Sequence, residues 1–510
     1  MHIVLNIGLF LRILFSKRFE SGQIVIIYHT EIQEGIQIIF MNKFYKKDPV
    51  FYKRVFAITL PIALQSLITI GVNMLDTIMV GSLGDDALSA TSLANSFITV
   101  YHIFCMGLGM GASVLVSRYW GMKKASAEKS DMDGEDRAVH ALKQTVALML
   151  RITLGLAAGF AAATAIIPNY IMKMYTSEQA ILEFGVTYLT FSVITFFFQG
   201  SSLVCTIVLR SVGQVRLPLF VSIGAFFVNL SANYILIFGK LGAPALGVAG
   251  AALGTLAARV FEALIICGYF LIFDTRIGFK IRDLLMDTRK IIAEYFRVSI
   301  PVLISDGILA IGSNTVAMVI GHLGGAFASA NAITAVTQQL SSVVITGASQ
   351  AGAIVTGQTL GEGNREKTME QGYLFFGLGL FLGTISALFI ILFSDLIIST
   401  YTNVSEEAVR IAKQLMLAIS IIIIFQGTNS IMTKGVLRGG GDTKMLMVTD
   451  NIFLWVLAIP LGLLGGYVLK VSPFWIYIFL KSDQIVKTVW AYLRLRSGKW
   501  IKKISTGLKE

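Results

Sequence analysis

An acidic residue that could bind a cation or carry a proton stands inside an apolar stretch, at Asp76 in the segment Asn73-Met-Leu-Asp76-Thr77. No basic residue lies within two helical turns of Asp76, so no local ion pair neutralises its carboxylate. An aspartate at the centre of a membrane helix costs about 2.5–3.5 kcal/mol, and such residues mark ion pathways. We expect Asp76 to face a hydrated cavity and to bind H⁺ or Na⁺, and we expect no other metal. The alternative places it at the outer interface, because a loop begins at Gly81.

Uncharged polar residues that could join this carboxylate occur in two later apolar stretches. Asn229 and Asn233 are four residues apart and therefore share one helix face, and Thr255 follows in the next stretch. Amide and hydroxyl oxygens beside a carboxylate suit a hard cation or a proton-linked network. The alternative role is interhelical hydrogen bonding, worth about 0.6 kcal/mol per bond.

Other charged residues fall inside apolar stretches and have simpler interpretations. Arg259 and Glu262 are three residues apart, a spacing that predicts a structural ion pair on one helix face. Asp306 follows Pro301 by five residues and could be either functional or structural. Near the end of the chain, Lys481, Asp483 and Lys487 would neutralise one another, and Asp450 has no assigned role.

Enzyme chemistry finds little support in the sequence. The histidines His102, His140 and His322 are scattered, and the chain has no HExxH, GxSxG or paired-cysteine motif. We therefore expect no catalytic residues, and no cofactor other than H⁺ or Na⁺ as coupling ion.

The composition shows which elements must position these residues. Only 14% of the 510 residues are charged and 55% are hydrophobic, whereas soluble proteins carry about 25% charged residues. Several stretches of roughly 20 residues or more are nearly free of charge, which is the length of a membrane-spanning helix. They do not alternate apolar and polar residues, so a β-barrel is excluded. The expected spans are 55–80, 92–117, 140–167, 184–208, 217–238, 247–273, 296–320, 331–357, 371–394, 409–436, 443–466 and 472–493.

The net charge of +12 comes mainly from alternate loops, which predicts membrane topology rather than nucleic-acid binding. Lysine and arginine residues lie before the first span, after every even-numbered span and at the end of the chain. The intervening loops contain almost no lysine or arginine. Arg210 and Arg216, for example, are counted in the loop after the fourth span. Both termini are therefore expected in the cytoplasm, with the protein in the plasma membrane.

An internal repeat relates the two halves of the chain. A shift of 240 places Pro61 on Pro301, Gly107 on Gly347 and Gly121 on Gly361. A slightly different shift places Leu209-Arg210 on Leu437-Arg438. Each half has six spans, an even number, so the halves are parallel repeats with a substrate site expected between them.

The repeat also predicts the domain organisation. We expect an N-terminal half at 49–275, a cytoplasmic linker at 276–292, a C-terminal half at 293–497 and a cytoplasmic tail at 498–510. Residues 1–48 lie outside the repeat and are expected to be an N-terminal extension, with a natural start at Met41.

Several of these segments resemble the multidrug and toxic compound extrusion (MATE) family of transporters. The resemblance runs from about Pro49 to Lys499. Its most specific pieces are Leu60-Pro61 with Met74-Leu-Asp76-Thr-Ile-Met-Val-Gly81, Gly247-Val-Ala-Gly250-Ala-Ala, Leu437-Arg438-Gly-Gly-Gly-Asp442-Thr-Lys444 and Arg494-Leu-Arg496-Ser-Gly498-Lys-Trp500.

The resemblance implies an all-α, V-shaped fold of twelve transmembrane helices that exports organic, often cationic compounds in exchange for Na⁺ or H⁺. It implies that Asp76 is the coupling residue, with Asn229 and Thr255 as its polar partners. The chain departs from the family where one branch has a second aspartate, here Asn233, and where another has a tenth-helix aspartate, here Asn429. A second polar site in the C-terminal half would then rest on Asp306 and Asn429.

The function expected from the sequence is thus an ion-coupled exporter that works as a monomer on small molecules in the lipid bilayer. The alternative is a flippase for a lipid-linked saccharide, whose cavity would need several basic residues for pyrophosphate. Arg151 and Arg259 are the main candidates for that role.

Overall fold

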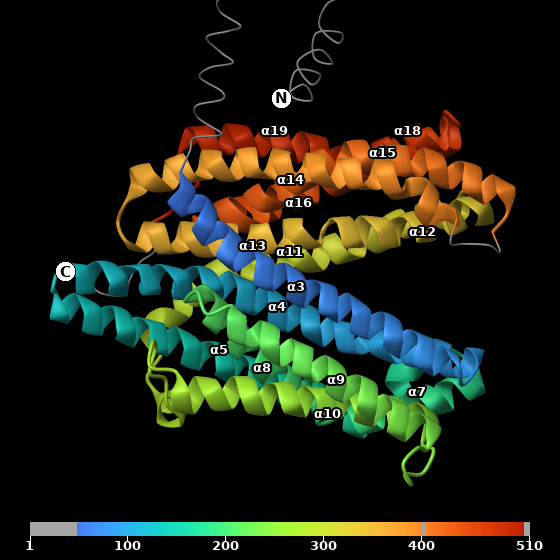
Figure 1. The fold of residues 1–510 in the computed structure, drawn as a ribbon, viewed down its shortest axis with the longest axis horizontal. Coiled ribbons are helices and arrows are strands. Elements are labelled where there is room, and N and C mark those ends of the chain that lie inside the picture. The colour runs from blue at the N-terminus through green and yellow to red at the C-terminus, as the bar shows by residue number, and fades with distance from the viewer. Residues whose placement is uncertain (1–47, 400–403, 504–510) are drawn as a thin grey trace, which may run out of the picture. The chain divides into compact units, whose positions relative to one another are not determined.

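A computed structural model describes residues 48–399 and 404–503, and every regular element in these ranges is helical (Figure 1). The expected N-terminal extension, including Met41, lies outside the described residues. The helices of the first half are α3 (Pro49–Gly81), α4 (Asp85–Glu128), α5 (Met132–Ile166), α6 (Pro168–Lys173), α7 (Gln179–Ser192), α8 (Thr195–Ser211), α9 (Arg216–Phe238) and α10 (Gly247–Gly268), which continues as the π-helix η1 (Tyr269–Phe273).

A 3₁₀-helix, η2 (Ile281–Leu285), lies between the halves. The helices of the second half are α11 (Arg289–His322), α12 (Gly325–Ser341), α13 (Val343–Gly361), α14 (Arg365–Ser399), α15 (Glu406–Ser430) with the π-helix η3 (Ile431–Leu437), α16 (Thr443–Ile452) with η4 (Phe453–Ala458), α17 (Ile459–Leu463) with η5 (Leu464–Val468), α18 (Pro473–Leu480) and α19 (Ser482–Ser497).

Short polar side chains begin several of these helices. Asp48 accepts a hydrogen bond from the Phe51 backbone N–H at 2.9 Å at the start of α3. Asp131 accepts one from Gly134 at 3.0 Å before α5, and Ser405 caps α15 through Ala408. These caps satisfy backbone donors that have no partner within the helix.

Within the described ranges, nine helices are long and apolar enough to cross a membrane, and two bent pairs bring the number to eleven. The pairs are α7 with α8, bent by 56°, and α12 with α13, bent by 45°. The expected twelfth span is the α18–α19 pair, which is interrupted at Lys481. The structure is therefore an all-α membrane fold, with every expected span in a helix or a helix pair.

Three expected spans, the fourth, the eighth and the twelfth, contain a break that hydropathy alone did not predict, and the eleventh contains a proline. In the eleventh, Pro460 lies at the start of α17 and cannot donate a backbone hydrogen bond, and π-helical turns precede and follow that helix. In the eighth, Ser342 lies at the bend, and its hydroxyl donates to the Gln339 carbonyl at 2.9 Å. Such bonds compete with the helical backbone pattern and are a known cause of bends.

The two halves form two groups of helices, blue to green for α3–α10 and yellow to red for α11–α19 (Figure 1). They contact one another through α3 and α4 of the first half and α11 and α13 of the second. Within the first half, a buried apolar core joins α4, α5 and α8 around Leu115, Met149 and Val208. The polar residues of interest therefore lie on helices that a packed apolar core holds in place.

Repeat-related glycines take part in the contacts between the halves. Gly107 on α4 lies against Leu303 of α11, and a Cβ at Gly107 would be 2.7 Å from the Leu303 Cα. Its repeat partner Gly347 on α13 lies against Thr59 of α3, where a Cβ would be 2.6 Å from the Thr59 carbonyl oxygen. The sequence repeat thus corresponds to a pair of equivalent helix crossings, and small residues permit the close approach.

Candidate functional site

Asp76 lies on α3 and is joined to the two asparagines of α9. The Asn233 amide donates to the Asp76 Oδ1 at 2.6 Å, and its distance to the Asn229 Oδ1 is 3.4 Å. Both asparagines are buried, and α9 packs against α3 and α10. The structure therefore places Asp76, Asn229 and Asn233 together, whereas the spacing of the two asparagines predicts only that they share one helix face.

Gly254 on α10 makes room for this arrangement, and no motif in the sequence points to it. A Cβ at Gly254 would collide with the Asn233 carboxamide. The Asn233 Oδ1 finds no hydrogen-bond donor among the described residues although it is buried. This oxygen, the Asp76 carboxylate and the Asn229 Oδ1 are therefore three oxygen atoms near the packing of α3, α9 and α10.

Thr255, Arg259 and Glu262 follow one another along α10 and line the same cavity as Asp76. The Arg259 Nη1 donates to the Glu262 Oε2 at 2.8 Å, so these two charges neutralise each other. No basic side chain of the described residues lies within 4.0 Å of the Asp76 carboxylate. Asp76 therefore remains an unpaired acid at the wall of the cavity.

The cavity has a volume of about 1110 Å³, slightly above the usual range of roughly 300–1,000 Å³ for small-molecule sites. Helices of both halves line it, with the first half contributing most of the wall. It extends from Val80 and Leu88, near the α3–α4 turn, to Arg210 and Gln350 at the opposite end. The charged residues among its described lining residues are Asp76, Arg210, Arg259 and Glu262.

Arg210 is a cavity residue that the sequence analysis missed. It was counted as a loop charge, but it lies in the last turn of α8. The Arg210 Nη1 donates to the Gln350 Oε1 on α13 at 2.8 Å, and the Nη2 donates to the Gln65 Oε1 on α3. The signal that could have identified it is the repeat, since Arg210 matches Arg438.

The halves are joined at this end of the cavity by further hydrogen bonds. Arg54 on α3 donates to the Gln358 side chain on α13 at 2.6 Å, and Gln358 donates to the Ser211 carbonyl at 2.7 Å. Arg118 on α4 donates to the Lys502 carbonyl at 2.9 Å. Helix packing and hydrogen bonds therefore close the cavity at the end that holds Arg210.

In the C-terminal half, the structure does not bring Asp306 and Asn429 together. Asp306 on α11 pairs with Arg438, with 3.2 Å between Oδ1 and Nη2. Asn429 on α15 donates to the Gln484 Oε1 at 2.9 Å, and Gln484 in turn donates to Asp483. The two residues thus belong to different polar networks.

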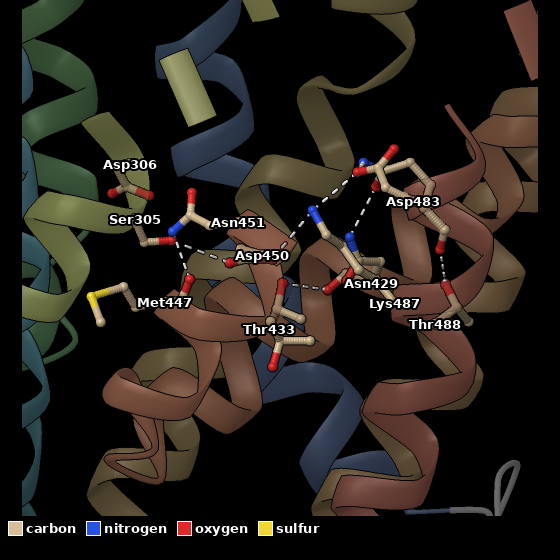
Figure 2. A network of polar contacts seen from close by, with 12 residues as sticks. Ser305, Asp306, Asn429, Thr433, Met447, Asp450, Asn451, Asp483, Lys487 and Thr488 are labelled. Carbon is tan, nitrogen blue, oxygen red and sulfur yellow. Dashed lines mark hydrogen bonds and ion pairs between the residues drawn. The ribbon is translucent and has the colours of Figure 1, made fainter. Parts of the chain in front are cut away.

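Asp450 belongs to the second of these networks, which Figure 2 shows. Lys487 on α19 lies between two carboxylates, 3.0 Å from the Asp483 Oδ2 and 3.5 Å from the Asp450 Oδ1. All three side chains are almost completely buried. Lys487 and Asp483 pair as the spacing suggests, and the partner of Asp450 comes from another helix.

Comparisons with known proteins agree with this architecture. The MatE family model matches residues 61–131, 135–235 and 301–464. The chain belongs to the MATE family of transporters. This MATE chain is 24% identical to the uncharacterized transporter YisQ of Bacillus subtilis strain 168, over 92% of this chain and 99% of YisQ. It is 25% identical to the multidrug resistance protein NorM of Aliivibrio fischeri, over 85% of this chain and 89% of NorM.

A solved structure confirms the fold. A point mutant of the Vibrio cholerae MATE transporter VcmN superposes with a TM-score of 0.78 and 17% sequence identity, covering 89% of this chain and 98% of that one. The twelve-helix MATE fold expected from the sequence is therefore the fold of this chain, and the protein is a multi-pass membrane protein.

Proposed function

We propose that this MATE protein exports organic, amphipathic and often cationic compounds in exchange for H⁺ or Na⁺. The observation that carries the proposal is the Asp76 carboxylate, unpaired by any nearby base and joined to Asn233 at the wall of a cavity of drug size. The names of relatives such as NorM point to the same class of function.

The coupling between ion and substrate would be reciprocal. An ion bound at Asp76 from outside disfavours a cationic substrate in the same cavity, because both depend on one negative charge. Substrate arriving from the cytoplasm then favours release of the ion. Coupling of this kind requires that each ligand bind the two conformations with different affinity.

In alternating access, the closed end of the cavity would open and the open end would close. The positive loops support a plasma-membrane protein with both termini in the cytoplasm. In that orientation, the contacts of Arg54, Gln358 and Arg210 close the cytoplasmic end. The described conformation would then be the one in which the cavity extends toward the outside.

Reconstituted vesicles test the proposal. The Na⁺ gradient and the pH gradient are imposed separately, and we expect purified protein to drive efflux of ethidium under one of them. The gradient that drives efflux identifies the coupling ion. Asp76→Asn should reduce ion-driven efflux to the level of protein-free vesicles, because a neutral amide cannot exchange the ion. Asp85→Asn is the matched control, since Asp85 is exposed at the start of α4 and outside the cavity lining. Undiminished efflux by the Asp76 variant contradicts the proposal.

The flippase alternative gains no support from the residues expected to serve it. Arg151 donates to the backbone carbonyls of Leu284 and Met286 in and after η2, and it does not line the cavity. Arg259 is occupied by Glu262. A pyrophosphate would require several free basic groups in one place.

A further inference from the structure

Arg210 carries a positive charge that no nearby carboxylate neutralises. Its two hydrogen-bonded partners, Gln65 and Gln350, offer neutral amide oxygens, and its Nε is buried with no partner among the described residues. No carboxylate in the described ranges lies within 4.0 Å of the guanidinium.

The second half shows what this arginine lacks. Arg438, the repeat partner of Arg210, is paired at 3.2 Å with Asp306 on the first helix of its half. At the position of Asp306, the first half has Ser66, next to the Gln65 that binds Arg210. The same scaffold position therefore holds a neutralised arginine in one half and an unneutralised one in the other. Only the unneutralised arginine lines the cavity.

The charges of the described cavity wall reduce to one free anion and one free cation. Arg259 and Glu262 cancel, which leaves Asp76 and Arg210. Eleven residues of α3 separate Asp76 from Gln65, the partner of Arg210, which corresponds to about 16 Å along the helix axis.

We propose that Arg210 binds an anionic group, such as a carboxylate, on the transported compound, so that the preferred substrates are zwitterions. This inference rests on the proposed export function and names its substrate class. The positive end of the substrate lies toward Asp76, where it competes with the coupling ion, and the negative end lies toward Arg210. A guanidinium forms strong, directional hydrogen bonds with a carboxylate, and amide partners are readily exchanged for a charged one.

A matched pair of dyes tests this assignment in proteoliposomes. A rhodamine free acid is zwitterionic and its methyl ester is a cation, so the two differ in one negative charge. The measured quantity is the ratio of kcat/KM for the acid to that for the ester. We expect Arg210→Gln to lower this ratio by about tenfold or more, because the substrate anion loses its charged partner.

Three further variants separate binding from folding and gating. Ser66→Asp should also lower the ratio, because it supplies Arg210 with a carboxylate at the position that Asp306 occupies in the other half. Arg210→Lys keeps the charge and should retain most of the preference for the acid. Gln350→Ala removes a bond between the halves but keeps the guanidinium, and should leave the ratio unchanged.

Two results would overturn the inference. One is an unchanged ratio in both Arg210→Gln and Ser66→Asp, which would leave Arg210 a purely structural link between the halves. The other is a ratio that falls below the wild-type value by the same factor in Gln350→Ala and in Arg210→Gln. Wild-type protein that moves neither dye under any ion gradient contradicts the export function itself. If transport depends on Asp76 but the acid-to-ester ratio is the same in the wild type, Arg210→Gln and Ser66→Asp, the export function stands and only this inference is contradicted.

Discussion

The Lys487 ammonium stands between the carboxylates of Asp450 and Asp483 in the C-terminal half, and all three side chains are almost fully buried. Ser305 on α11 donates to the Asp450 Oδ2 at 3.4 Å and connects a third helix to the group (Figure 2). Buried charges are tolerated when they are paired and hydrogen-bonded, as they are here. The ammonium therefore holds α16 and α19 together.

Removing this ammonium should destabilise the protein strongly. Lys487→Met keeps the length of the side chain but leaves two buried carboxylates without a cation, which costs about 3–5 kcal/mol. The measurement is unfolding of the purified protein in detergent, and a clearly lowered melting temperature is expected. Asp483→Asn in the same chain should restore part of the loss, because it removes one unpaired charge.

A surface pair provides the control for this prediction. The Lys413 Nζ lies 3.0 Å from the Asp395 Oδ1, with both side chains mostly exposed. Lys413→Met should cost less than about 1 kcal/mol, because solvent screens exposed pairs. Equal effects of the two substitutions would show that Lys487 is not a buried structural cation.

The polar contacts differ in how far the sequence predicts them. Asn229 and Asn233 share a face by spacing alone, and their proximity to Asp76 needs only that α9 pack against α3. The pairing of Asp450 with Lys487 joins helices separated by two π-helical segments, which no local pattern describes. Arg210 was misplaced because hydropathy alone put the end of α8 in a loop. The repeat, which compares tertiary positions, contained the missing information.

At the scale of helices, the sequence predicted which stretches form long apolar helices but not where these helices bend. Composition continues unchanged through the 56° bend between α7 and α8, so hydropathy cannot detect it. The glycines of α4, in contrast, mark close helix contacts by residue type alone, because only a residue without a side chain permits such an approach. Three of them, Gly107, Gly109 and Gly111, lie against Leu303, Ile207 and Ser299.

Adding a methyl group at one of these crossings should separate α4 from α11. A Cβ at Gly107 would be 2.7 Å from the Leu303 Cα, so Gly107→Ala requires the backbone to move. Overpacking of this kind costs about 1–3 kcal/mol and should lower the melting temperature. Gly155→Ala in α5 is the control, because a Cβ there meets nothing within 4 Å and alanine favours the helix. A loss of stability at Gly155 as large as at Gly107 would contradict this explanation.

At the scale of the whole molecule, the repeat places equivalent helix crossings in the two halves, but the charged residues of the two halves differ. Gly121 of α4 and Gly361 of α13 are repeat partners, and each lies against the other helix at the closed end of the cavity. The first half holds an unpaired acid, Asp76, and an arginine without a carboxylate partner, Arg210. In the second half the repeat partner of Arg210, Arg438, is paired with Asp306, and Val316 stands at the repeat position of Asp76. The first half is therefore suited to bind ligands and the second to provide a stable counterpart for its movement.

The Gly121–Gly361 crossing predicts how the closed end could be held apart. A Cβ at Gly121 would collide with the Gln358 carbonyl oxygen, so Gly121→Val should prevent α4 and α13 from meeting and should abolish transport. Spin labels on cysteines introduced at Lys129 and Asn364, both exposed near this end, report the separation of the two halves. We expect a longer label distance in the Gly121→Val protein than in the parent, with the melting temperature lowered only modestly. Gly159→Val in α5 is the matched control, because a Cβ there meets nothing within 4 Å. An unchanged label distance in a folded but inactive Gly121 variant would show that this crossing does not control closure, since the loss of transport would then have another cause.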